Sequence, residues 1–198
     1  MSKLLTPDHA STATPQLNRR QLITAAVTLA GGLALARHAP AANAAENVAG
    51  RLQALGIQLP EPPAPVANYV AYLVQDNFAY IAGQIPFANG ELLFPGSVPN
   101  EVSVDAARIA ARQCGINILA ALSGACEGNL DRVRQCMRLD GFVASADGFT
   151  QQPQVINAAS DLMVEVFGDA GRHTRTAVGV NELPLNACVE ISAVFVID

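Results

Sequence analysis

The stretch HTRTAVGVNELPLNACVEI, residues 173–191, decides the fold because it contains two strand-like segments separated by a short loop. Apolar residues alternate with small or polar ones on both sides of NELPLN, which is rich in turn-forming residues. The pattern predicts a β-hairpin with strands over residues 173–180 and 187–197. Within these two strands, Arg175 and Glu190 are charges placed among apolar and small side chains.

Alternation sorts the side chains of this predicted hairpin onto two faces of a sheet. The strongly apolar face of the last strand consists of Val189, Ile191, Ala193, Phe195 and Ile197. We expect this face to lie under helices, so Arg175 and Glu190 are both predicted to project from the helix-free face, opposite or diagonal to each other. Their predicted neighbours are all small: Ala177, Gly179, Cys188 and Ser192. The hairpin therefore leaves room for a ligand beside the two charges.

The remainder of the chain mixes strand and helix patterns. Strands are predicted over residues 69–74, 78–84 and 130–143, and helices over 47–55, 103–123 and 152–167. Ser103 provides an N-cap, and Gly168 ends the last helix. After the short first helix, the order β-β-α-β-α-β-β predicts an α+β domain: a mostly antiparallel sheet with two helices packed on one face.

The predicted helix-free face is too apolar to meet water. Val194, Val196, Cys136 and Cys188 are all assigned to it by alternation. We therefore expect an obligate oligomer in which another copy of the chain covers this face. A cleft at such an interface is a natural place for a ligand.

The first 44 residues resemble a twin-arginine export signal. Arg19 and Arg20 precede an apolar run at residues 22–36, and an A-x-A cleavage pattern ends at Ala44. We expect export by the twin-arginine machinery to the periplasm or the medium, with cleavage after Ala44. No stable membrane anchor is expected, because about 15 residues is short for a bilayer span. An ordinary secretory signal or a membrane tether is the alternative.

The predicted organisation is a signal at 1–44, a lead-in with a short helix and a Pro-rich stretch at 45–65, and the domain at 66–198. After residue 44 the chain has eight arginines, no lysine and sixteen acidic residues, a formal charge of −8. Lysine Schiff-base chemistry is excluded, and nucleic acid is disfavoured as a partner. His173 is the one histidine of this part, which excludes a multi-histidine metal site within one chain. We expect the four cysteines to be buried and reduced.

Several segments resemble the reactive-intermediate deaminase family, RidA or YjgF, over about residues 50–198. They occur in family order: ANYV, YIAGQIP, NILAAL, GFVAS, INAASDL and RTAVGVNELPLNACVEI. The resemblance implies a chorismate-mutase-like fold and a homotrimer with three clefts between subunits. It also implies hydrolysis of 2-enamine or 2-imine acids, such as 2-aminoacrylate, to the 2-oxo acid and ammonia, without a cofactor or a metal.

The resemblance also implies roles for individual residues. Arg175 matches the arginine that grips the substrate carboxylate, and Glu190 the glutamate that holds or activates water. The remaining matching positions are Gly83 and Ala177, which offer backbone groups, and Tyr69 and Asn157, which line the pocket. Ala82 departs from the Ser or Thr frequent at that position, which bears on rate and substrate choice.

Other functions are compatible with the same residues. A non-catalytic trimer could bind small carboxylates in the same clefts, and an endoribonuclease is a less supported alternative because the domain is acidic and lacks lysine after residue 44. Arg175 and Glu190 could instead form a structural salt bridge between chains. His173 is expected to be a strand-edge or interface residue rather than a catalytic base.

Overall fold

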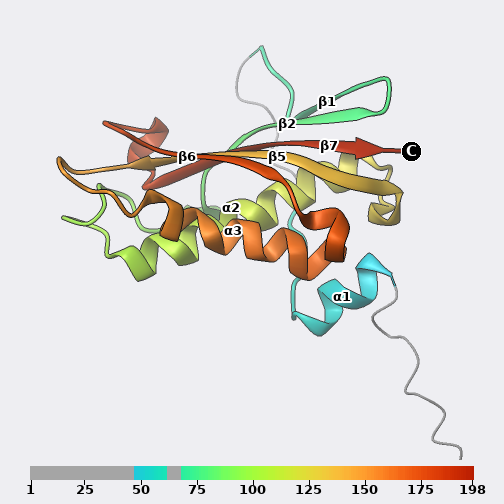
Figure 1. Ribbon diagram of the computed structural model, residues 1–198, viewed down its shortest axis with the longest axis horizontal. Helices are drawn as coiled ribbons and strands as arrows, with labels where there is room; N and C mark the ends of the chain where they lie inside the picture. The colour runs from blue at the N-terminus through green and yellow to red at the C-terminus, as the bar shows by residue number, and fades with distance from the viewer. Residues whose placement is uncertain (1–46, 62–67) are drawn as a thin grey trace, which may run out of the picture. The chain divides into compact units, whose positions relative to one another are not determined.

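The computed structural model describes residues 47–61 and 68–198 (Figure 1). The predicted export signal, residues 1–44, lies outside these ranges, as does most of the Pro-rich segment. All of the described residues belong to one compact unit of the chain. None of the helices within the two described ranges has the length and apolar character needed to cross a membrane.

A five-stranded sheet forms the centre of the domain, with the strand order β1-β2-β7-β5-β6. The strands are β1 (Tyr72–Gln75), β2 (Phe78–Gln84), β7 (Val189–Ile197), β5 (Val133–Ala144) and β6 (Thr174–Val180). Every neighbouring pair is antiparallel except β5 and β6, which are parallel. The prediction of a mostly antiparallel sheet is confirmed. Two short strands, β3 (Phe87–Ala88) and β4 (Glu91–Leu92), pair with each other in a separate two-stranded sheet.

Two long helices, α2 (Val104–Ala125) and α3 (Gln152–Phe167), pack on one face of the sheet, as predicted (Figure 1). The hydroxyl of Ser103 caps α2 by accepting the backbone N–H of Ala106 at 3.2 Å. Gly168, with φ of 63°, ends α3 in a conformation that other residues rarely adopt. Between helices and sheet lies a single apolar core.

The short helix α1 (Val48–Ala54) is also present as predicted, and Asn47 caps it by accepting the backbone N–H of Gly50 at 2.8 Å. The backbone N–H of Val48 donates to a carboxylate oxygen of Asp131 at 2.8 Å, and Arg51 donates to the carbonyl oxygen of Val166 at 3.0 Å. These bonds attach the lead-in segment to the end of α3 and to the short 3-10 helix (Leu130–Arg132) that precedes β5.

The predicted hairpin is wrong, because β5 lies between β6 and β7. Strand β6 pairs with β5 in parallel, and β7 pairs with the other edge of β5 in antiparallel. Parallel neighbours require a crossover, and α3 supplies it. The NELPLN loop, with a short 3-10 helix at Pro184–Asn186, carries the chain past β5. Alternation predicted strands here correctly but could not identify their neighbours.

The predicted faces of β5 are wrong near its first half, because a bulge interrupts the alternation. The register shifts between Cys136 and Arg138, so Cys136 lies opposite Phe195 in the core while Met137 is exposed. Cys188 is buried as well, so neither cysteine contributes to the helix-free face. All four cysteines are buried and free, as expected.

Candidate functional site

Arg175 lies on β6, the edge strand of the sheet, and points to the helix side. It is paired opposite Leu139, which is fully buried under the helices. Its Nη1 donates to Oδ1 of Asn157 at 2.8 Å and to Oγ of Ser160 at 3.1 Å, both on α3. The predicted placement on the helix-free face is therefore wrong, because the parallel register with β5, not a hairpin, sets the face.

Only one of the three guanidinium nitrogens of Arg175, Nη1, makes hydrogen bonds within the described residues. Nη1 carries two N–H groups and has two acceptors, Asn157 and Ser160, so both of its N–H groups can be satisfied. Among the described residues, neither Nε nor Nη2 has a hydrogen-bond acceptor, and no carboxylate pairs with this arginine. Nε and Nη2 lie along one edge of the guanidinium plane, which matches the two oxygens of a carboxylate.

Glu190 lies on β7, opposite Phe142 of β5, and projects from the helix-free face. Its side chain is half-buried, and this burial raises its pKa above the ordinary value for glutamate. Within the described part of the chain it has no hydrogen-bond donor and no cationic partner. The higher pKa makes this carboxylate a better proton acceptor than an ordinary glutamate.

Gly83 lies directly beside Glu190. The register between β2 and β7 is irregular from Ile81 to Gln84, so Gly83 falls in a bulge. A Cβ atom added to Gly83 would lie 1.9 Å from Oε1 of Glu190. Glycine at this position therefore leaves the space that the carboxylate occupies. Bulges of this kind are common beside functional sites because they redirect side chains.

Arg175 and Glu190 do not meet within one chain. Their strands are separated by β5, so two strand spacings, about 10 Å, lie between them. The residues they pair with on β5, Leu139 and Phe142, are three positions apart, and the two charges project from opposite faces. The predicted opposite or diagonal placement is therefore wrong. One chain supplies two separate clusters: Arg175 with Asn157, and Glu190 with Gly83.

The other two predicted residues lie near the edges of the sheet. Ala177 is on β6, two residues from Arg175, and packs partly against the core. As an edge strand, β6 directs some of its backbone N–H and C=O groups away from the sheet. Tyr69 precedes β1 at the opposite edge and is 53% exposed.

Sequence reasoning missed Ser160 in the Arg175 cluster, and it did not foresee the contact between His173 and Ser160. Ser160 contacts Arg175 directly, and Nε2 of His173 lies 3.1 Å from the Ser160 hydroxyl. A signal for Ser160 was available, because it follows Asn157 by three residues and so shares its face of the helix. His173, two residues before Arg175, lies just outside β6, as expected for a strand-edge residue.

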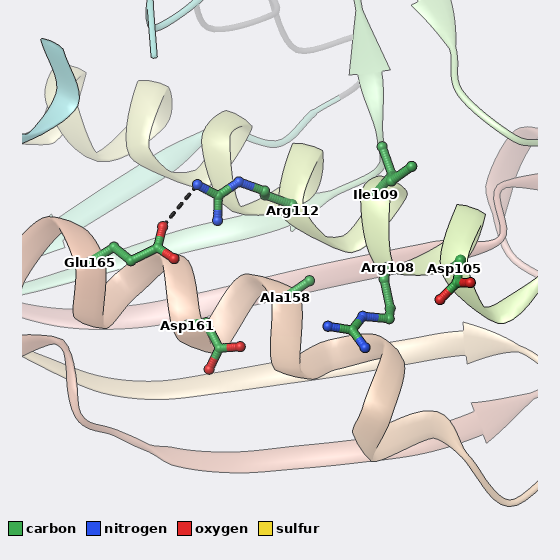
Figure 2. Close-up of a pocket in the computed structure, with 7 residues that line it drawn as sticks. All are labelled: Asp105, Arg108, Ile109, Arg112, Ala158, Asp161 and Glu165. Atoms are coloured by element: carbon green, nitrogen blue, oxygen red, sulfur yellow. Dashed lines mark hydrogen bonds and ion pairs between the residues drawn. The ribbon is translucent and has the colours of Figure 1, made fainter. Parts of the chain in front are cut away.

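A hollow of about 560 Å³, separate from the two clusters, lies between α2 and α3 on the outer side of the helices (Figure 2). Its lining residues are Asp105, Arg108, Ile109, Arg112, Ala158, Asp161 and Glu165. Arg112 and Glu165 form an ion pair across it at 2.8 Å. Three acidic and two basic side chains line an open groove, and no buried polar atom in the described residues lacks a partner. We assign no ligand to it.

No group of three or more His, Cys, Asp and Glu side chains in the described ranges is arranged to hold a metal ion.

Known proteins are similar to this chain in sequence and in fold. A family model described as "YjgF/chorismate mutase-like, putative endoribonuclease" matches residues 49–196. Protein TCP17 of Trypanosoma cruzi is 40% identical over 151 residues, which cover 76% of this chain and 94% of that protein. The range matched by the family model, residues 49–196, contains both the Arg175 cluster and the Glu190 cluster.

Two solved structures are similar. The protein Atu1372 of Agrobacterium tumefaciens is 44% identical with a TM-score of 0.72, covering 76% of this chain and 92% of its own. A protein from Shewanella oneidensis, titled a "putative endoribonuclease", is 32% identical with a TM-score of 0.74, covering 76% of this chain and 99% of its own. The sheet and helices that carry both clusters therefore recur in crystal structures of similar proteins.

Proposed function

The chain belongs to the YjgF family, also called RidA, and on this basis we propose that it hydrolyses 2-imine and 2-enamine carboxylic acids to 2-oxo acids and ammonia. The observation that carries the proposal is the guanidinium of Arg175, which is held through Nη1 while its Nε–Nη2 edge has no acceptor among the described residues. That edge would bind the carboxylate that all these substrates share.

Glu190 would perform the proton transfers. The enamine tautomerises to the imine, and water then adds to the imine carbon while the Glu190 carboxylate accepts a proton from it. Glu190 returns that proton to the imine nitrogen, which gives a neutral carbinolamine. Glu190 then accepts the proton of the carbinolamine hydroxyl as the C=O bond forms and passes it to the nitrogen as the C–N bond breaks, so ammonia and the 2-oxo acid are released. The raised pKa of Glu190 suits this cycle, because a base with a pKa nearer the working pH both accepts and returns a proton readily.

A complete site requires a second copy of the chain, because Arg175 and Glu190 are too far apart in one. Three large apolar side chains on the helix-free side of the sheet are exposed: Leu73 by 57%, Tyr80 by 45% and Val178 by 42%. Covering them with other copies would remove this apolar surface from water. We propose a homotrimer in which the Arg175 cluster of one chain faces the Glu190–Gly83 cluster of the next.

A non-catalytic carboxylate-binding trimer is the second candidate. Ala82 favours it, because this residue precedes Gly83 in the bulge and brings no hydroxyl to the site. The backbone N–H of Ala82 donates to the carbonyl oxygen of Ala71 at 3.0 Å, so this N–H already has an acceptor within the chain. The side chain of Ala82 offers no polar group to a ligand. Such a protein would bind 2-oxo acids through Arg175 without accelerating hydrolysis.

The proposal is tested by generating 2-imino acids in place with an amino-acid oxidase and measuring 2-oxo acid and ammonia release above the spontaneous rate. We expect acceleration by the wild type and none by Glu190→Gln. Binding of 2-oxobutyrate without acceleration would favour the non-catalytic trimer. RNA cleavage that survives Arg175→Ala would instead favour the nuclease activity in the family description.

A further inference from the structure

A chain of hydrogen bonds runs from the backbone to Arg175. Nδ1 of His173 lies 2.6 Å from the carbonyl oxygen of Gly171, and Nε2 lies 3.1 Å from Oγ of Ser160. Ser160 in turn accepts from Nη1 of Arg175 at 3.1 Å. We propose that Ser160 and His173 are positioning residues that set the direction of the free Arg175 edge. This inference rests on the proposed role of Arg175 as the carboxylate anchor.

When the His173 imidazole is neutral, the hydrogen-bonding capacities of these groups fix a single direction for the chain. A carbonyl oxygen only accepts, so Nδ1 of His173 must carry the proton given to Gly171. In the neutral imidazole Nε2 is then an acceptor, and the hydroxyl of Ser160 donates to it. That orientation turns the lone pairs of the Ser160 oxygen toward the N–H of Arg175. His173 thus acts on Arg175 through the hydroxyl of Ser160.

Arg175 is held by neutral groups, in contrast to most arginines of the domain. Five others pair with carboxylates: Arg112, Arg132, Arg134, Arg138 and Arg172. An amide oxygen and a hydroxyl fix the guanidinium of Arg175 without neutralising it. Its whole charge is therefore available to an incoming carboxylate. Restricting its orientation beforehand also removes part of the ordering cost from ligand binding.

The test measures binding of 2-oxobutyrate by calorimetry, together with imine turnover and thermal unfolding. Ser160→Ala should raise Kd and KM by about 3- to 10-fold, the effect of losing one hydrogen bond, with kcat changed by less than about twofold. Ser160→Thr keeps the hydroxyl and should bind close to wild type. Ser123→Ala, which makes the same change on α2, is the matched control and should leave Kd unchanged.

A pair of substitutions at His173 separates positioning from packing. Glutamine can place its oxygen near the position of Nε2 and still accept from Ser160, whereas asparagine reaches only the position of Nδ1. We expect His173→Gln to retain most of the affinity and His173→Asn to weaken it like Ser160→Ala. Equal losses in the two His173 variants would overturn the role of His173 as an acceptor for Ser160.

The proposed order of the chain predicts non-additivity. Because His173 acts through Ser160, the double variant Ser160→Ala/His173→Asn should bind no more weakly than Ser160→Ala alone. Additive losses would overturn the relay. If Arg175→Ala loses binding while Ser160→Ala binds like wild type, this inference fails and the proposed function stands. If Arg175→Ala itself binds 2-oxobutyrate normally, the carboxylate anchor of the proposed function is wrong.

Discussion

Replacing Arg175 with alanine should remove carboxylate recognition while leaving the fold intact. Its free edge can donate two charge-assisted hydrogen bonds, through Nε and Nη2, to one substrate carboxylate. Allowing for solvent exposure, losing them should cost about 2–4 kcal/mol, which is roughly 30- to 1000-fold in kcat/KM. Thermal stability should change little, because the exposed side chain gives up only hydrogen bonds to Asn157 and Ser160.

Lysine at the same position should recover little of the lost activity. An ammonium group retains the charge but cannot hold the acceptors on α3 and present a planar two-point fork at the same time. Arg172→Ala is the matched control. Arg172 lies three residues before Arg175, carries the same charge and forms an exposed ion pair with Asp169. That control should keep near wild-type kcat/KM, since exposed ion pairs contribute little.

The assay combines imine turnover, 2-oxobutyrate binding and sedimentation for each variant. If Arg175 and Glu190 form only a structural salt bridge between chains, Arg175→Ala and Glu190→Gln should weaken assembly equally, and activity should follow assembly. A well-assembled Arg175→Ala protein that still turns over imines at the wild-type rate would refute the assignment of Arg175 as the carboxylate anchor.

Four further predictions concern other parts of the chain. Because burial raises the pKa of Glu190, turnover should decline as the pH falls through a value above the pKa of an ordinary glutamate. Glu190→Gln should be inactive. This variant should also be more stable than wild type above the pKa of Glu190, and the gain should vanish at acid pH, where both side chains are neutral. Gly83→Ala should displace the Glu190 carboxylate and lower kcat, with unfolding little changed because the clash is with a flexible side chain. Tyr80→Arg should convert the expected trimer to smaller species in sedimentation, because it places a charge on the exposed apolar face. Replacing Arg19 and Arg20 with lysine should leave uncleaved precursor in the cytoplasm, and unchanged export would indicate another route.

The helices were predictable from local signals, and the strand order was not. Ser103 and Gly168 act within a turn of the backbone, so their effect on α2 and α3 can be inferred from the sequence alone. Strand pairing depends on contacts between distant segments. The NELPLN segment favours a turn in either topology, and only the packing of α3 as a crossover makes β6 a neighbour of β5.

The face of Arg175 was mispredicted because β6 lacks a clear apolar side. Thr176 and Val178 alternate with Ala177 and Gly179, and every residue of this edge strand is at least partly exposed. Alternation therefore could not choose between the two orientations. In β7 every second side chain is buried, and there the assignment of Glu190 to the helix-free face is correct. Alternation assigns a side chain to the correct face only where the two faces of a strand differ clearly in polarity.

The electrostatics of the domain favour a small monocarboxylate over a polyanion. The part after residue 44 has a formal charge of −8, so an extended polyanion would be repelled along its whole length. A single carboxylate needs only one local positive site, and Arg175 provides it because its anchors are uncharged. Five of the arginines that a longer polyanion would need are already paired with Asp or Glu. If this reasoning is right, added salt should weaken 2-oxobutyrate binding only slightly, because one charge pair in a partly covered cleft is screened far less than a row of phosphate contacts.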